Sequence, residues 1–168
     1  MPRSFDMAAD YDGTVDQIHR AFGDERYWLE RLAWSGADTT SLDSLTAGAD
    51  GGVEVVTIQT LRADRLPGVV TQFHRGDLSF VRAETWTPLS GGSASAVVKG
   101  TIPGAPATVT GSAVLAATGA GSRLTFKATV EVRIPLVGGK VENFIGSQMV
   151  DLLIAEQQFT TAWIRENA

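Results

Sequence analysis

One segment near the C-terminus constrains the fold more than any other. Residues 141–165 contain no proline and a single glycine, Gly146, and their apolar residues recur at spacings of three and four. This spacing predicts a helix of about 25 residues, roughly 37 Å long. The positions on its apolar stripe are Val141, Phe144, Ile145, Gln148, Met149, Leu152, Glu156, Phe159 and Trp163. Val150, Leu153 and Ile154 add apolar groups on further sides, so another layer must enclose this helix, and a curved antiparallel sheet is the natural partner.

The segment before this helix predicts the sheet. Between residues 123 and 136, apolar and polar side chains alternate, which indicates one buried and one solvated face. The apolar positions are Leu124, Phe126, Ala128, Val130, Val132 and Ile134. Shorter runs that end at glycine or proline predict further strands at residues 53–61, 78–87, 94–102 and 108–117.

The N-terminal part predicts a strand and two short helices. Residues 4–10 alternate weakly, and Thr14 and Gln17 then have the spacing of a helix-capping box. Tyr27, Trp28 and Leu32 repeat at helical spacing before Gly36. Residues 66–76 fit either one helical turn or an irregular connection. The order contains no alternation of strands and helices, so we expect an α+β fold in a single domain, residues 1–168.

Residues 134–142, with the sequence IPLVGGKVE, form the most specific motif of the chain. On this motif and the element order, the chain resembles the START-like, pollen-allergen-like helix-grip superfamily (SRPBCC), which includes polyketide cyclases and lipid-transfer domains. It looks closest to a branch of uncharacterised actinobacterial proteins. The resemblance implies a sheet of about seven strands around the long C-terminal helix, with an apolar cavity between them. It implies no catalytic residue, because the superfamily shares none.

Composition excludes several classes of function. A net charge of −5, from 14 basic and 19 acidic residues, offers no basic surface for nucleic acid or for an anionic membrane. The chain has no cysteine and only two histidines, so we expect no metal and no cofactor. The first residues lack the apolar core of a signal peptide, and no run approaches about 18 apolar residues. We therefore expect a cytoplasmic protein without an integral membrane segment; its oligomeric state stays open.

Two functions fit these observations. The first is binding of a hydrophobic small molecule or lipid between the sheet and the C-terminal helix. The alternative is an enzyme of the polyketide cyclase or dehydratase kind, in which Glu156 or His74 moves a proton within the same cavity. An empty cavity of about 300 Å³ would destabilise a domain by roughly 7 kcal/mol, so the cavity should be small, wet or filled.

The predicted ligand-binding residues come mostly from the long helix. They are Trp28, Trp86, Phe144, Gln148, Met149, Leu152 and Glu156. For Trp28, Trp163, Phe144 and Met149 we favour packing over specific ligand contact, although packing around a hollow is what forms an apolar pocket, and Gln148 suits contact with a neutral ligand.

Charged residues near the expected cavity leave alternatives open. Arg82 and Glu84 would orient a polar ligand group if they face the helix, but we favour the outer face because burying charge is unfavourable. For the same reason we expect Glu156 to reach water; facing the cavity, its pKa would be raised. His74 is either a residue at the cavity mouth or a solvated loop residue, and His19 is expected to be structural.

Overall fold

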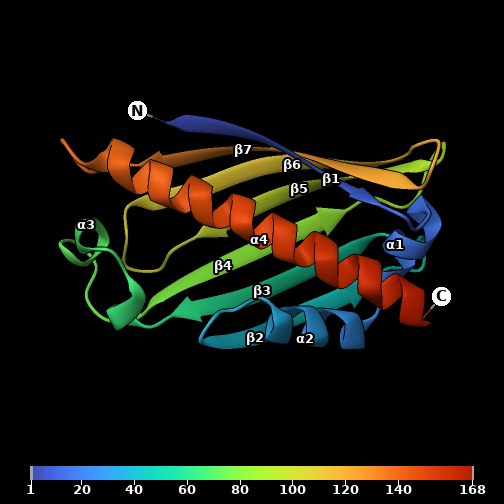
Figure 1. Cartoon of the computed structure of the whole chain (residues 1–168), viewed down its shortest axis with the longest axis horizontal. Coiled ribbons are helices and arrows are strands. Elements are labelled where there is room, and N and C mark those ends of the chain that lie inside the picture. The colour runs from blue at the N-terminus through green and yellow to red at the C-terminus, as the bar shows by residue number, and fades with distance from the viewer. Residues whose placement is uncertain (1, 168) are drawn as a thin grey trace.

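A computed structural model describes residues 2–167, which form a seven-stranded antiparallel sheet and a long C-terminal helix (Figure 1). The strands are β1 (Arg3–Tyr11), β2 (Thr39–Ala47), β3 (Val53–Leu61), β4 (Leu78–Trp86), β5 (Ser93–Thr101), β6 (Ala107–Ala117) and β7 (Ser122–Val132). The helices are α1 (Val15–Phe22), α2 (Glu25–Trp34), α3 (Gly68–Thr71) and α4 (Gly138–Asn167), with a short 3₁₀ turn, η1 (Ala63–Arg65). The predicted α+β class and the two short helices after the first strand are confirmed.

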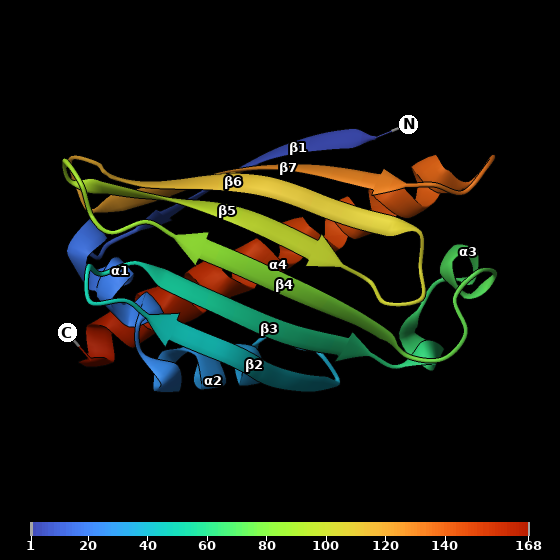
Figure 2. The same cartoon turned by 180° about the vertical axis from the view of Figure 1, so that it is seen from behind.

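The sheet wraps around α4, as predicted. Its strand order is β1-β7-β6-β5-β4-β3-β2, and every neighbouring pair is antiparallel. Helix α4 crosses one face of the sheet diagonally, and the view from behind shows the opposite face without a helix over it (Figure 2). Helices α1 and α2 lie beside the C-terminal half of α4, whereas α3 lies at the other end of the molecule (Figure 1).

The chain passes from β7 into α4 earlier than predicted. Strand β7 ends at Val132 rather than at residue 136, and α4 begins at Gly138 rather than at residue 141. A Cβ atom on Gly138 would lie 2.8 Å from the Val132 carbonyl oxygen, so only glycine permits this close turn. The fully buried carboxylate of Glu142 then accepts a hydrogen bond of 2.9 Å from the Val132 N–H, which ties the first turn of α4 to the end of β7.

Two other sequence predictions have clear outcomes. Thr14 and Gln17 form the expected capping box at the start of α1. The segment at residues 66–76 contains one helical turn, α3, followed by an irregular return to β4.

The core divides into two clusters along α4. The cluster beneath α1, α2 and the C-terminal half of α4 is rich in aromatic rings, among them Phe22, Tyr27 and Trp28. The cluster around the N-terminal half of α4 consists largely of valine, isoleucine, leucine and alanine, with some phenylalanine packed against it. The aromatic cluster packs between helix and sheet, whereas the aliphatic cluster borders a cavity of about 260 Å³.

Candidate ligand-binding cavity

A cavity of about 260 Å³, here called the outer cavity, lies between the N-terminal half of α4, the α3 segment and the adjoining strand ends. Its apolar lining includes Val70, Phe73, Leu78, Ile102, Val132 and Ile145. Polar side chains are few, and they include Gln59, Arg65 and Gln148. A concave, mostly apolar space with a few polar groups is the usual form of a small-molecule site.

A smaller cavity of about 60 Å³, here called the inner cavity, lies deeper along the same helix. Phe80, Met149 and Leu152 line both cavities and therefore form the boundary between them. The Phe80 ring lies directly over Gly100, where a Cβ atom would stand 2.4 Å from Cζ of the ring. Gly100 thus gives Phe80 the room to occupy this boundary.

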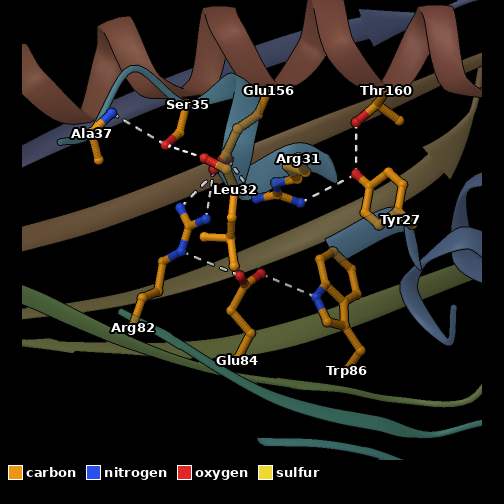
Figure 3. A network of polar contacts seen from close by, with 10 residues as sticks. All are labelled: Tyr27, Arg31, Leu32, Ser35, Ala37, Arg82, Glu84, Trp86, Glu156 and Thr160. Atoms are coloured by element: carbon orange, nitrogen blue, oxygen red, sulfur yellow. Dashed lines mark hydrogen bonds and ion pairs between the residues drawn. The ribbon is translucent and has the colours of Figure 1, made fainter. Parts of the chain in front are cut away.

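Four charged side chains line the inner cavity: Arg31, Arg82, Glu84 and Glu156, here called the charged cluster (Figure 3). Glu156 on α4 accepts from Arg31 Nη2 at 2.5 Å and from Arg82 Nη2 at 2.6 Å. Arg82 Nε lies 3.3 Å from Glu84 Oε2, and the other oxygen of Glu84 accepts a hydrogen bond of 3.2 Å from the Trp86 indole. Three elements, α2, β4 and α4, therefore meet through these charges.

Aromatic neighbours hold Arg31 in place. Its guanidinium carbon lies 4.5 Å from the centroid of the Trp28 ring, a cation–π arrangement, and its Nη1 donates to the Tyr27 hydroxyl at 3.2 Å. The Tyr27 and Thr160 hydroxyls lie 2.7 Å apart (Figure 3). Burial raises the pKa of the Tyr27 hydroxyl, which therefore stays protonated and able to donate to Thr160.

The structure corrects our expectations for three of these charges. Glu156 is buried rather than in contact with water, and Arg82 and Glu84 face the helix rather than the outer surface. Burial alone would raise the pKa of Glu156, but the adjacent guanidinium groups of Arg31 and Arg82 outweigh it and lower that pKa. The expected raised pKa was wrong because pairing, rather than desolvation, dominates.

The sequence contained a signal for the orientation of β4. Leu78, Phe80 and Trp86 share the face of Arg82 and Glu84, whereas the other face carries smaller side chains. Arg31 was missed altogether. It follows Tyr27 by four residues on the same face of α2, and its partner Glu156 interrupts the apolar stripe of α4.

The predicted ligand-binding residues fall into three places. Phe144 and Gln148 line the outer cavity, Gln148 as an exposed side chain, and Met149 and Leu152 line both cavities. Trp86 and Glu156 line the inner cavity. Trp28 is fully buried against Phe22 and Tyr27 and lies in neither lining. Their contact with a ligand stays a prediction.

His74 lines the outer cavity from the loop after α3. Its Nε2 lies 3.3 Å from the Pro103 carbonyl oxygen, which can only accept, so this nitrogen carries the proton of the neutral ring. Nδ1 is buried and has no hydrogen-bond partner within residues 2–167. The other histidine, His19, is buried, with Nε2 2.8 Å from the Thr87 carbonyl oxygen.

Two further findings concern the described part of the chain. It contains no group of three or more histidine, aspartate or glutamate side chains arranged to hold a metal ion. None of its helices combines the length and the apolar character needed to cross a membrane.

Comparison with known proteins gives relatives over the full chain. A family described as "Protein of unknown function (DUF2505)" matches residues 6–164. Uncharacterized protein Rv0481c of Mycobacterium tuberculosis and uncharacterized protein Mb0491c of Mycobacterium bovis are each 50% identical over 173 residues, which cover 99% of both chains. The predicted resemblance to actinobacterial proteins is confirmed.

Solved structures share the fold at low sequence identity. A STAR-related lipid transfer protein from Xanthomonas axonopodis has a TM-score of 0.60 at 14% identity and covers 97% of this chain and 86% of its own. The di-domain ARO/CYC BexL of the BE-7585A biosynthetic pathway has a TM-score of 0.62 at 15% identity, over 96% of this chain and 49% of its own. Ara h 8.0201 has a TM-score of 0.56 at 10% identity, over 96% and 99%. These similarities show the helix-grip fold.

Proposed function

The chain belongs to the DUF2505 family, and from that premise we propose that it binds a largely apolar small molecule in the outer cavity, with the polar end of that molecule toward the charged cluster. The observation that carries the proposal is that an apolar cavity of about 260 Å³ shares the lining residues Phe80, Met149 and Leu152 with a second cavity lined by buried charges. A buried ion pair adds little stability over apolar packing of the same volume. Charges placed at the end of an apolar cavity therefore suggest recognition of a ligand.

The charged cluster favours an uncharged polar group such as a hydroxyl. Its two arginines and two glutamates balance, and a ligand carboxylate would approach both Glu84 and Glu156. Arg82 Nε and Glu84 Oε2 face each other without hydrogen-bond geometry, and neither has another hydrogen-bond partner in the described chain. A hydroxyl can accept from the first and donate to the second. The inner cavity, at about 60 Å³, has room for such a group but not for a hydrocarbon tail.

Relatives of the fold support a ligand of this general class. One neighbour is described as a lipid transfer protein and another as an ARO/CYC protein of a biosynthetic pathway. At 14% and 15% identity, these neighbours share the fold, and their ligands are not carried over to this chain.

The first test is native mass spectrometry of the protein purified from its own host, followed by denaturing extraction. We expect a bound mass that is released on unfolding and is soluble in organic solvent. Ala105→Trp should abolish this mass because Ala105 lines the outer cavity. Ala120→Trp, in the exposed turn between β6 and β7, is the matched control and should retain it. A ligand-free wild-type protein that also binds no neutral fluorescent probe would refute the proposal.

A cyclase-like or dehydratase-like enzyme is the second candidate, and one observation favours it. In the neutral ring of His74, Nδ1 is the unprotonated nitrogen, and this residue lines the outer cavity. Such a nitrogen is suited to accept a proton from a bound substrate. Glu156 is less suited, because two guanidinium groups stabilise its ionised form. If the wild type turns over no co-purified compound, this candidate is excluded, and turnover that survives His74→Ala would show that His74 is not the base.

A further inference from the structure

The outer cavity lies at the end of the molecule formed by residues 62–77, 102–106 and 133–137, here called the loop end. These connections cluster together at one end in both views, on the side of α3 (Figures 1 and 2). The connection from β7 to α4 adjoins the cavity directly, because Ile134 and Val141 on either side of it line that cavity.

Leu136 is the most exposed large apolar residue of the loop end. Its side chain is fully exposed, and its φ angle of 72° lies in the left-handed region that favours glycine. Hydrogen bonds from the Val137 N–H to the Pro135 carbonyl and from the Gly138 N–H to the Ile134 carbonyl hold the turn in shape. A rigid turn thus presents a leucine that contributes nothing to the core, in a strained conformation. Strain of this kind concentrates at functional sites.

Three exposed cations lie on the same end of the molecule as Leu136 or within four residues of it in the sequence. Arg75, Arg133 and Lys140 are exposed, and none of them forms an ion pair with a residue in the described range 2–167. Lys140 follows Leu136 by four residues, and Arg133 precedes it by three. Arg75 lies on the neighbouring loop after α3.

The carboxylates of the loop end are already engaged. Asp38 pairs with Arg65 at 2.9 Å, and Asp64 pairs with Arg62 at 3.4 Å. The Asp77 carboxylate accepts from the Ala63 N–H. Glu131 is half-buried on β7, and Glu142 is fully buried. Within the described chain, three exposed cations without an ion pair, Arg75, Arg133 and Lys140, therefore outnumber one exposed carboxylate without an ion pair, Asp77, and the charge of this end is positive on balance.

The net charge of −5 is a sum over the whole chain and does not describe the loop end. Exposed carboxylates that form no ion pair with a described residue, such as Asp24 and Glu25 beside and on α2, lie at the opposite end of the molecule. From the net charge we excluded binding to an anionic membrane, but the positive charge of the loop end removes the reason for that exclusion.

We propose that the loop end docks on the surface of an anionic lipid bilayer, with Leu136 among the acyl chains and Arg75, Arg133 and Lys140 against the headgroups. An exposed apolar residue on an end of the molecule that carries three exposed cations is complementary to a negatively charged, apolar-cored surface. Attachment is peripheral and reversible, because one leucine and three cations make a small contact. The proposal goes beyond ligand binding and does not depend on it, since the docking residues lie outside both cavities.

The test is co-sedimentation with vesicles of phosphatidylcholine containing about 30% phosphatidylglycerol, compared with pure phosphatidylcholine. We expect the wild-type protein to sediment with the anionic vesicles only, and added salt to release it. The double variant Arg133→Gln/Lys140→Gln should bind about 25-fold more weakly, since each cation near such a surface contributes about fivefold. Lys127→Gln, on an exposed side chain near the middle of β7, should change the partitioning by less than about twofold.

The variant Leu136→Gly distinguishes a loss of vesicle binding from a loss of folding. Glycine adopts the left-handed conformation without strain, so this variant should melt no lower than the wild type and yet lose vesicle binding. Leu29→Asp on the exposed face of α2 is the matched control and should bind as the wild type does. Equal losses for both variants, or no sedimentation of the wild type at low salt, would overturn the proposal. So would a dimer, seen by sedimentation velocity without vesicles, that Leu136→Gly dissociates, since Leu136 would then contact a second copy.

Discussion

The C-terminal half of α4 covers packed aromatic rings, whereas its N-terminal half covers a cavity of about 260 Å³ on the same sheet. In the C-terminal half, α1 and α2 add aromatic rings between the sheet and the helix. The centroid of the Tyr27 ring lies 5.4 Å from that of Trp28 and 5.6 Å from that of Trp163. In the N-terminal half, the four-residue α3 and the neighbouring loops close the end, and most lining side chains are aliphatic. One long helix can thus serve as core at one end and as the wall of a binding site at the other.

The charged cluster lies between these halves. Its arginines are held by rings and carboxylates of the packed half, yet its open atoms face the inner cavity. Rigid surroundings fix polar groups in the orientation that a ligand requires. The packed half therefore supplies stability and preorganisation, and the hollow half supplies volume.

Truncating one large ring in each half should give the largest difference in stability between the two halves. Trp28 is fully buried, and its indole donates to the Phe22 carbonyl at 2.7 Å, so Trp28→Ala should lower the free energy of unfolding by about 4 kcal/mol. Phe144→Ala at the outer cavity should lower it by only about 1–2 kcal/mol, because part of that ring already faces a void. Urea unfolding at neutral pH measures both, and equal losses would show that the hollow half is as tightly packed as the other.

Removing the carboxylate of Glu156, at the centre of the charged cluster, should have the next largest effect on the free energy of unfolding. Glu156→Gln leaves Arg31 and Arg82 without their shared partner in a buried site, and should lower the free energy of unfolding by about 3 kcal/mol. Asp151→Asn, on the same helix but exposed at the outer cavity, should change it by less than about 0.5 kcal/mol. A small effect of Glu156→Gln would mean that water already screens the cluster.

Lowering the pH should destabilise the wild type more steeply than the Glu156→Gln variant. The folded state holds the pKa of Glu156 below the ordinary value of 4.5, so the unfolded chain takes up its proton first as the pH falls. The stability from this group is complete above that ordinary value and is lost as the pH falls toward the lowered pKa. The wild type should therefore lose stability with a slope up to about 1.4 kcal/mol per pH unit steeper than that of Glu156→Gln. Asp10 and Asp38, whose pKa values arginines also lower, are present in both proteins, so parallel pH curves would contradict the prediction.

Most elements of the fold were predictable because each follows from local pattern, whereas the polar edge strand β2 (Thr39–Ala47) shows no such pattern and was not predicted. Alternation on β7, the stripe on α4 and the capping box at Thr14 depend on neighbours a few residues apart. The boundary between β7 and α4 was not predictable, since it depends on a contact of Gly138 with the Val132 backbone.

The site was only partly predictable from the sequence. The stripe of α4 indicated Phe144, Met149 and Leu152 as cavity residues, and these line one or both cavities. The charged cluster depends on pairing between α2, β4 and α4, which lie far apart in the sequence. We judged each charge alone, and an isolated buried charge is unfavourable, whereas a mutually paired set is tolerated.

The boundary between the two cavities offers the finest test of the comparison. Phe80→Leu removes part of the ring that separates them and should lower the free energy of unfolding by only about 1 kcal/mol. The space released admits about two further methylene groups, so the affinity for a long ligand should rise about 15-fold at about 0.8 kcal/mol each. Displacement of the neutral probe N-phenylnaphthylamine by octanol, dodecanol and hexadecanol measures this, and the gain should appear only for the longer alcohols.

Leu78→Ala is the control for that measurement. Leu78 lines the outer cavity alone, on the same strand and face as Phe80, so its truncation enlarges one cavity and leaves the boundary in place. The gain should then be similar for all three alcohols. If both variants give the same dependence on chain length, Phe80 does not limit the length of ligand that the cavities accept. If only Phe80→Leu favours the longer alcohols, the packed half of the molecule sets the length of ligand that the hollow half accepts.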